Sequence, residues 1–406
     1  MRFVHKLLSQ WTLHSSSGLH LSFLDGLRGL AILMVVVAHG VYANPDGPRS
    51  FIAIAHLTST GGLGVQMFFA LSGFLISYPF FRRRQRGDCF SVPRGYAWRR
   101  ALKVFPPFYL AILLLSLFYF WHTRDPSYFP LGLQWASGWA AFVNCPKYFN
   151  TSFWSLWVEI QFYVVLPLLF LLGRKCSVRV AGWCLFGLLL IGPFLTRGLT
   201  WPQPGDPDFA FLMRRFPSAL DGFAWGVLFA ALFTLHPPDA HNRRLARLGY
   251  AGLALLACGL VALAGSTFFL HLTDWSRFLF EGKKLLPGLA CFLIMFFAYD
   301  AHSAGARLLA SPLLRFVGMV SFEWFLLHQP MQNFARELAV SAQGNPLRYL
   351  AVVGIPSGLT LVVAVLIYHC FSHPILNWGR GRLEESRLRT SPSSMLAGNE
   401  DSARPD

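Results

Sequence analysis

Charged residues are scarce in this 406-residue chain, at 13% of the sequence, against about 25% in an ordinary soluble domain. Hydrophobic residues make up 54% and aromatic residues 16%. So few charges cannot cover the surface of a soluble protein of this length, which excludes a cytosolic globular enzyme. The seven cysteines contain no CxxC pair, which excludes a zinc ribbon and a disulfide scaffold. The composition is that of an integral membrane protein.

Ten stretches are long and apolar enough to cross a bilayer, since about 20 helical residues cover a hydrocarbon core of about 30 Å. A further stretch, Leu131–Asn144, has only 14 residues and contains Gln134, so we expect it to be interfacial or re-entrant. The predicted fold class is therefore all-α, a polytopic membrane protein with about ten transmembrane helices. The predicted spans are roughly residues 24–43, 62–81, 104–121, 154–173, 177–199, 217–235, 248–270, 285–299, 313–335 and 348–371.

Acidic residues are few, 19 against 35 Lys and Arg, and the distribution of the basic residues predicts the orientation. If both termini are cytoplasmic, the cytoplasmic segments hold 23 of the 35 basic residues and the opposite segments hold 11, as the positive-inside rule expects. We therefore predict cytoplasmic N- and C-termini. The domains expected are a cytoplasmic N-terminal segment (1–22), a transmembrane domain (23–378) and a disordered, polar cytoplasmic tail (379–406).

Ionisable side chains inside a span are costly, so each one is a candidate functional residue. In the first span, Arg28 and His39 are eleven residues apart, which places them on one helix face about 16 Å from each other. Asp25 precedes Arg28 by three residues and is placed to pair with it. Two interpretations stay open: an Asp–Arg pair and an interfacial histidine that only anchor the helix ends, or a functional pair.

Other spans bring ionisable groups to the level of His39. Glu159 is expected roughly 8 Å below the outer boundary of its helix, His328 roughly 22 Å along a helix that enters from inside, and Asp221 near the outer end of its span. A histidine held by a carboxylate is a common general base. This shared depth favours a reaction centre near the outer face, although depth alone does not establish contact.

The segment Arg82–Lys103 carries eight positive charges in 22 residues. It is typical of a cytoplasmic loop that sets topology or contacts anionic lipid, and it also suits a phosphate-binding site for a polyanionic ligand. Pro106 and Pro107 are predicted in the first turn of the third span. In the glycine-rich stretch 61–74, close helix packing is favoured over a cavity lined by Gln66 and Ser72.

Several motifs in series, from residue 23 to about 374, resemble the membrane-bound acyltransferase-3 family. They are Leu24-Asp25-Gly26-Leu27-Arg28-Gly29 with Arg-x10-His ending at His39, Phe68–Ile76, Arg99–Pro107, Trp154–Tyr163 and Leu326–Pro330. Members of this family O-acylate polysaccharides, O-antigens and other extracytoplasmic acceptors. The resemblance implies ten core spans, an acyl-CoA donor (usually acetyl-CoA) from the cytoplasm and a glycan acceptor outside a bacterial inner (plasma) membrane.

The resemblance also assigns functions to residues. It implies that Arg28 and His39 are required, and that Arg99 and Arg100 act on the donor. Lys103 stands where an arginine is common, which keeps the charge and loses a bidentate fork. Ser372-His373-Pro374 replaces the usual glutamate-arginine-proline at the end of the last span, so a function of that motif is in doubt here.

These observations combine into one hypothesis. The phosphates of CoA bind Arg99, Arg100, Lys103 and Arg28, while His39, oriented by Glu159, removes the proton of the acceptor hydroxyl. Transfer through an acyl-histidine is a variant, and a glycan or lipid transporter or flippase with an Arg/His/Glu relay is the alternative. We expect lipid and glycan partners, no metal and no nucleic acid. Candidate supporting or acceptor-site residues are Asp25, Ser72, Trp154, Ser155, Asp221 and His328.

Overall fold

The computed structural model describes residues 21–42, 61–137, 152–199, 216–239, 241–269, 277–339 and 346–389. Within these ranges the chain forms helices, turns and loops and contains no β-strand. The helices are α2 (Ser22–Tyr42), α4 (Gly61–Gln85), α5 (Tyr96–Thr123), α6 (Tyr128–Ala136), α7 (Phe153–Leu172), α8 (Val178–Leu199), α10 (Asp221–Leu235), η2 (Asn242–Ala246), α11 (Arg247–Phe269), α12 (Arg277–Ile294), η3 (Met295–Tyr299), α13 (Ala304–Leu309), α14 (Pro312–Met319), α15 (Ser321–Ala339), α16 (Pro346–Ile367), the π-helix η5 (Tyr368–Ser372) and α17 (His373–Arg389).

Six stretches of these helices are long and apolar enough to cross a membrane, judged by length and composition. They are Ser22–Gly40, Gly62–Gln85, Tyr96–Thr123, Phe153–Leu172, Val178–Leu199 and Gly354–Glu385. Asp221–Leu235 and Leu285–Tyr299 are shorter apolar helices. The all-helical membrane architecture is therefore confirmed for the part of the chain that the structure describes. The count of ten spans and the side on which the termini lie stay predictions.

The predicted span 313–335 is wrong as a single helix. It consists of α14, which ends at Met319, and α15, which begins at Ser321. At the C-terminal end, α17 continues past Gly379 to Arg389, where a disordered tail was expected to begin. The run Leu383-Glu384-Glu385 is rich in good helix formers, which accounts for the extension. Residues 390–406 lie outside the described residues.

The position predicted for Pro106 and Pro107 is also wrong, because both lie inside α5, which begins ten residues before Pro106, at Tyr96. The helix starts early because residues 97 and 99–103 are the good helix formers Ala, Arg, Leu and Lys, and because Tyr96 and Val104 are buried; α5 accommodates the two missing N–H groups of its prolines in its interior. Arg100 and Lys103 therefore lie on an ordered helix and not in a loop. Their spacing of three residues places both on one face of α5.

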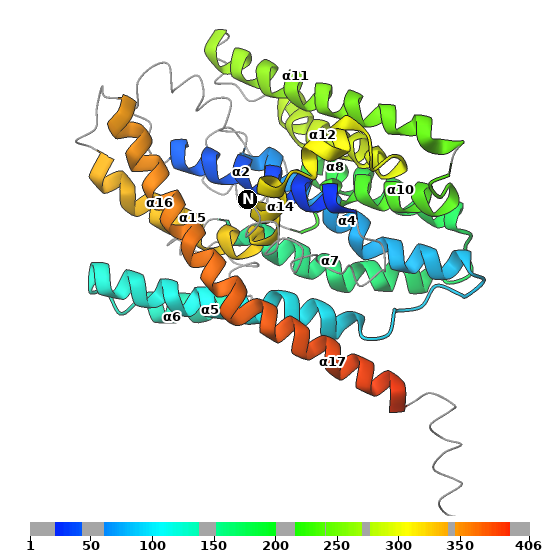
Figure 1. Ribbon diagram of the computed structural model, residues 1–406, viewed down its shortest axis with the longest axis horizontal. Helices are drawn as coiled ribbons and strands as arrows, with labels where there is room; N and C mark the ends of the chain where they lie inside the picture. Colours follow the sequence, from blue (N-terminus) through cyan, green and yellow to red (C-terminus); the bar gives the residue numbers. More distant parts are fainter. Residues whose placement is uncertain are drawn as a thin grey trace, which may run out of the picture.

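Helices α2 and α4 form the centre of the bundle. Within the most apolar window of each span, 61% of the residues of α2 and 72% of those of α4 are buried, whereas only 22% are buried in the corresponding window of the last span. Figure 1 shows α2 and α4 between α5 and α6 along one edge and α11 along the opposite edge. Most side chains on these two central helices are thus surrounded by protein.

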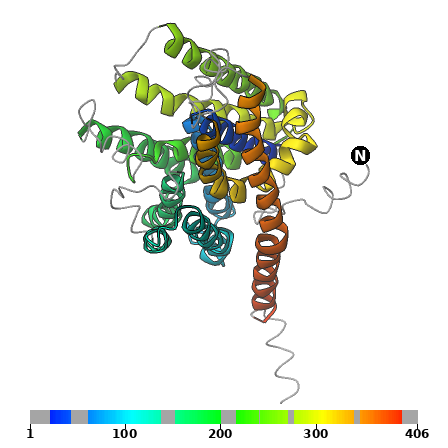
Figure 2. The same ribbon diagram turned by 90° about the vertical axis from the view of Figure 1, so that its left-hand side faces the viewer.

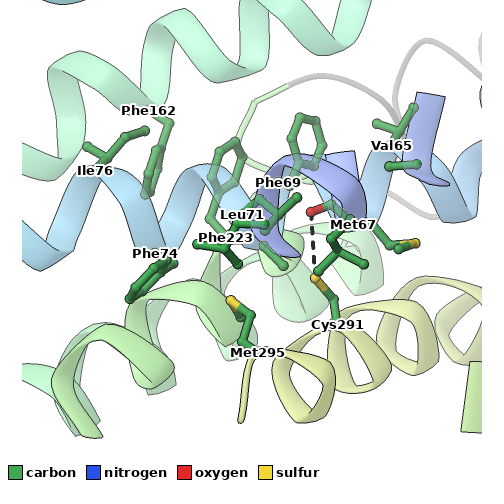
Figure 3. Packing of buried hydrophobic residues seen from close by; sticks show 14 of the residues in the cluster. Val65, Met67, Phe69, Leu71, Phe74, Ile76, Phe162, Phe223, Cys291 and Met295 are labelled. Carbon is green, nitrogen blue, oxygen red and sulfur yellow. Dashed lines mark hydrogen bonds between the residues drawn. The ribbon is translucent and has the colours of Figure 1, made fainter. Parts of the chain in front are cut away.

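An aromatic core joins α4 to its neighbours (Figure 3). The ring of Phe223 on α10 stacks on Phe69 of α4 at 4.5 Å and on Phe162 of α7 at 4.0 Å between ring centroids. On the α12 side, the thiol of Cys291 donates a weak hydrogen bond to the carbonyl of Met67, with 3.8 Å between sulfur and oxygen. These contacts hold α4 rigidly against three other helices.

Glycines on α2 and α14 allow α2 to approach the helices that follow η3 very closely. A Cβ atom at Gly26 would overlap the carbonyl oxygen of Leu309, and one at Gly318 would overlap that of Asp25. On α4, Cβ atoms at Gly64 and Gly73 would overlap the backbones of neighbouring helices in the same way. The predicted packing function of the glycine-rich stretch is thus confirmed at these two positions.

Helix α17 continues beyond the end of the bundle (Figure 2). Its first part contacts α5, where the rings of Trp378 and Trp98 lie 5.8 Å apart and Gly379 packs against Leu102. The guanidinium of Arg382 lies 5.8 Å from the centroid of the Trp378 ring. Exposed tryptophans beside arginines are typical of a membrane–water interface.

Candidate active site

A cavity that is partly connected to solvent lies between α2, α4, α5, α7 and α15. Its polar lining consists of three cationic, one anionic and four hydroxyl side chains: Arg28, Arg100, Lys103, Glu159, Ser72, Ser155, Tyr163 and Ser321. The rest of the wall is apolar: Val65, Phe68, Phe69, Leu71, Leu75, Val104, Leu156, Phe322 and Phe325. Six residues predicted from sequence as catalytic, donor-binding or supporting therefore share one cavity.

The positive charges in the cavity come from two helices. Arg28 projects from α2, and Arg100 and Lys103 project from one face of α5. Arg100 is held over two aromatic rings, with its guanidinium carbon 5.4 Å from the centroid of Tyr163 and 5.9 Å from that of Tyr96. With Glu159 included, the charged side chains that line the cavity carry a net positive charge, which favours an anionic ligand.

Two buried polar atoms in this wall have no hydrogen-bond partner within the described residues. They are Nε of Arg28 and Oγ of Ser321. A buried donor without a partner costs about 1–3 kcal/mol, so such groups are rare unless a ligand or water completes them. An anion with several oxygen atoms, such as a phosphate, supplies acceptors of the required kind.

Arg99 is not among the residues that line the cavity. Arg99 directly precedes Arg100, and its guanidinium lies beside Gly95, near the side chain of Leu383 on α17. The helical start of α5 is the reason, because adjacent residues on a helix point about 100° apart. Of the predicted donor-binding residues, Arg28, Arg100 and Lys103 therefore lie together in the cavity, and Arg99 does not.

Glu159 accepts two hydrogen bonds on the same oxygen. Ser72 Oγ donates to Oε1 at 2.5 Å, and the hydroxyl of Tyr163 donates to it at 2.7 Å. The hydroxyl of Tyr96 donates to the carbonyl oxygen of Tyr163 at 3.0 Å, which links α5 to α7. Glu159 is thus held on the wall of the cavity, and within the described residues it accepts no hydrogen bond from His39.

The ring beside His39 is that of His328 on α15. Nε2 of His328 lies 3.3 Å from Nδ1 of His39, and the ring centroids are 5.0 Å apart. Nδ1 of His39 also lies 2.9 Å from the carbonyl oxygen of Val35. His328 is 0% exposed, whereas His39 is only partly buried. The structure thus places two histidines, from α2 and α15, side by side, and an imidazole stands next to His39 where a carboxylate was expected.

The histidine pair adjoins the cavity without lining it. Phe325 lines the cavity, and its ring centroid lies 5.9 Å from that of His328. Phe325 also forms an edge-to-face pair with Phe68 of α4, with ring centroids 6.5 Å apart. The cationic cavity and the histidine pair are therefore neighbours, with a pair of phenylalanine rings at their junction.

Asp221 belongs to a different structure. Its carboxylate lies 2.9 Å from the guanidinium of Arg197, and the two side chains are 1% and 0% exposed. Arg197 also donates to the carbonyl oxygen of Ser218. The position of Asp221 therefore does not match its prediction as an acceptor-site residue, because its carboxylate takes part in a buried ion pair that joins α8 to the start of α10.

Of three further predicted residues, Ser155 lines the cavity, while Trp154 and Asp25 are not among its lining residues. Trp154 packs edge-to-face on Phe69 with ring centroids 6.0 Å apart, and Ser155 donates to the carbonyl oxygen of Ser152 at 3.1 Å. Asp25 lies in the first turn of α2, where a carboxylate is favourable to the helix dipole. No group of three His, Cys, Asp or Glu residues suited to a metal occurs within the ranges that the structure describes.

Sequence reasoning missed two polar members of the cavity wall, Tyr163 and Ser321. Tyr163 was detectable, because it follows Glu159 by four residues and therefore shares its helix face. Ser321 was not, because the break between α14 and α15 gives it its position as the first residue of a new helix.

Comparison with family models matches residues 21–369 to the acyltransferase-3 family, described as an acyltransferase domain. YrhL of Bacillus subtilis (strain 168), named for a proposed peptidoglycan O-acetyltransferase activity, is 24% identical over 376 residues, which are 88% of this chain and 55% of the relative. OatA of Staphylococcus aureus (strain NCTC 8325 / PS 47), named an O-acetyltransferase, is 24% identical over 384 residues, 89% of this chain and 58% of the relative.

A third relative, the acyltransferase MdmB of Streptomyces mycarofaciens, is 30% identical over 186 residues, which are 43% of this chain and 46% of the relative. The chain thus spans about half the length of these curated relatives. No solved structure matches it.

Proposed function

The chain belongs to the acyltransferase-3 family, and we propose that it is an integral membrane O-acyltransferase that moves an acetyl group from acetyl-CoA to a hydroxyl of an extracytoplasmic glycan. The observation that carries this proposal is the cationic cavity adjoining the His39–His328 pair. Relatives named as O-acetyltransferases, one of them for peptidoglycan, support an acetyl donor and a glycan acceptor. The transporter alternative is not favoured by any of these observations.

Binding of the donor rests on charge. Arg28, Arg100 and Lys103 converge on the cavity, and Arg28 Nε and Ser321 Oγ are buried there without a partner. The phosphates of CoA match this lining, because phosphate oxygens accept charge-assisted hydrogen bonds from arginine and lysine. The apolar wall formed by rings such as Phe322 and Phe325 suits the less polar pantetheine arm. Helix α2 connects the donor-binding cavity to the histidine pair, since Arg28 and His39 lie about 16 Å apart along this one continuous helix.

In the transfer step, His39 is the general base. Nε2 of His39 takes the proton of the acceptor hydroxyl as the oxygen attacks the thioester carbonyl. A C–O ester bond forms, the C–S bond breaks, and the leaving thiolate takes the proton that His39 removed from the hydroxyl, so that CoA leaves as the thiol and His39 is neutral again. An acyl-histidine on His39 is the variant of this step.

The orientation follows the positive-inside prediction. Both termini lie in the cytoplasm, and the enzyme resides in a bacterial inner (plasma) membrane with the donor cavity open to the cytoplasmic side. Under this orientation the end of α2 that carries Arg28 faces the cytoplasm and the end that carries His39 faces outward. The acceptor then reaches His39 from the outer side, where its ring is only partly buried.

The test is transfer by the purified protein in proteoliposomes with labelled acetyl-CoA and candidate glycans, including peptidoglycan fragments. We expect labelled ester in the wild type, none in His39→Ala, and wild-type rates in His302→Ala, whose side chain is exposed away from the cavity. Normal transfer by His39→Ala would remove His39 from the mechanism. Ping-pong kinetics with a trapped acylated His39 would select the acyl-histidine variant, and ternary-complex kinetics would select direct transfer.

A further inference from the structure

The structure assigns a positioning function to His328. We propose that Nε2 of His328 accepts a hydrogen bond from Nδ1–H of His39 and so holds His39 in the tautomer whose Nε2 is unprotonated. The contact itself is a geometric observation, with 3.3 Å between the two nitrogens. Its meaning for catalysis rests on the proposed function, in which His39 is the general base.

The acceptors around the two rings determine the tautomers. Nδ1 of His328 lies 2.9 Å from the carbonyl oxygen of Phe325 and 3.3 Å from that of Trp324. Carbonyl oxygens only accept, so this nitrogen carries the hydrogen. A second hydrogen on Nε2 would make His328 an imidazolium at a site with 0% exposure, which is costly. Nε2 of His328 is therefore a lone-pair acceptor.

The same reasoning applies to His39. Its Nδ1 faces two acceptors, the carbonyl oxygen of Val35 at 2.9 Å and Nε2 of His328 at 3.3 Å. Without a hydrogen on Nδ1, three lone-pair atoms would face one another. Neutral His39 therefore carries its hydrogen on Nδ1, and its Nε2 is unprotonated, as a general base requires.

His328 also contributes when His39 becomes charged. Proton transfer to Nε2 turns His39 into an imidazolium, whose Nδ1–H is a stronger donor than that of the neutral ring. Two neutral acceptors, Val35 carbonyl and His328 Nε2, receive it. These two acceptors hold the orientation of the ring and stabilise the imidazolium, which are the functions of the carboxylate in a Ser–His–Asp triad. Glu159 does not do it in this structure, because its Oε1 binds Ser72 and Tyr163.

The backbone that carries His328 is fastened to its neighbours on three sides. Gln332 Nε2 donates to the carbonyl oxygen of Val36 on α2 at 2.9 Å. Gln329 Oε1 accepts from the amide and hydroxyl of Ser152 at 2.9 and 2.8 Å. The indole of Trp324 donates to Thr360 on α16 at 3.1 Å. The imidazole of His328 is thus held at a fixed place relative to α2, as a positioning residue must be.

Kinetics of two variants test the proposal. His328→Phe keeps a planar ring and removes the acceptor, while His328→Gln keeps an acceptor oxygen. We expect kcat to fall about 10- to 100-fold in His328→Phe and to recover to within about tenfold of the wild type in His328→Gln. KM for acetyl-CoA should stay unchanged in both, because His328 does not line the cavity. Wild-type kcat in His328→Phe would overturn the proposal, and so would equal losses in two folded, donor-binding variants.

Nitrogen NMR of the ¹⁵N-histidine-labelled protein in lipid tests the tautomers directly, with resonances assigned through His39→Gln and His328→Gln. We expect protonated Nδ1 and bare Nε2 on both rings of the wild type, and a share of Nε2–H tautomer at His39 in His328→Phe. A wild-type His39 protonated at Nε2 would overturn the proposal even where His328→Phe does not fold. If the wild type transfers no acyl group, the proposed function fails, and the spectrum still decides the tautomer.

Discussion

The buried pair of Arg197 and Asp221 gives a prediction whose size follows from its geometry. At 2.9 Å, in an effective dielectric constant of about 20, the attraction is about 6 kcal/mol. Desolvation of both ions offsets much of this, but truncation of one partner leaves the other charge buried and alone. Asp221→Ala should therefore lower the free energy of unfolding by about 3–5 kcal/mol.

The matched control is Asp88→Ala, which removes one partner of an exposed pair. Arg83 and Asp88 lie 3.7 Å apart with side chains 39% and 58% exposed, so its loss should change the free energy of unfolding by about 0–1 kcal/mol. Unfolding of the purified proteins in detergent, titrated with SDS and followed by tryptophan fluorescence, measures both. An Asp221→Ala variant as stable as Asp88→Ala would refute the reasoning.

A double variant separates structure from chemistry at this position. Arg197→Met with Asp221→Leu replaces both ions by apolar side chains, and buried pairs replaced in this way commonly regain the lost stability. We expect unfolding within about 2 kcal/mol of the wild type and normal acyl transfer per folded molecule. Loss of transfer in a stable double variant would return Asp221 to the acceptor site that its depth in the sequence suggested.

Two further predictions concern the cavity and the helix packing. Arg100→Ala should raise the Kd for CoA about 10- to 100-fold by removing a charge-assisted hydrogen bond to phosphate. The control Arg86→Ala, at an exposed residue, should leave the Kd unchanged. Isothermal titration calorimetry measures both values, and equal Kd values for the two variants would contradict the donor site. Gly226→Ala should destabilise the protein by about 1–3 kcal/mol, because its Cβ would overlap the carbonyl oxygen of Ala70. The added Cβ of Gly187→Ala meets no atom within 4 Å, so this variant should stabilise α8 by about 0.5–1 kcal/mol. Unfolding in SDS measures both, and a Gly226→Ala variant as stable as the wild type would contradict the close approach of the two helices.

Sequence reasoning succeeded where one helix determines the outcome. Arg28 and His39 share a face of α2 because their spacing and the continuity of the helix are properties of the sequence itself. The same holds for the general class, since apolar runs of this length have no other stable environment. The motifs added the family, which the match over residues 21–369 confirms.

It failed where the arrangement of several helices decides. Glu159 and Asp221 share a depth with His39 in the sequence, yet one binds Ser72 and Tyr163 while the other pairs with Arg197. Depth along a helix is one coordinate, and contact also needs the neighbouring helix and its rotation. The helix boundary at Tyr96 had a local cause, and it moved Arg99 away from the cavity while Arg100 stayed.

The break at Val320 has a mechanical consequence. Because α15 is separate from α14, one short rigid rod carries Ser321, Phe322 and Phe325 at the cavity and His328 beside His39. A side chain reaches about 5–6 Å from a helix axis, so a twist of this rod by about 10° displaces its outer atoms by about 1 Å. A shift of that size is enough to lengthen the 3.3 Å contact between the imidazoles beyond hydrogen-bond range. The geometry of the cavity wall and that of the imidazole pair are therefore both set by the orientation of a single helix.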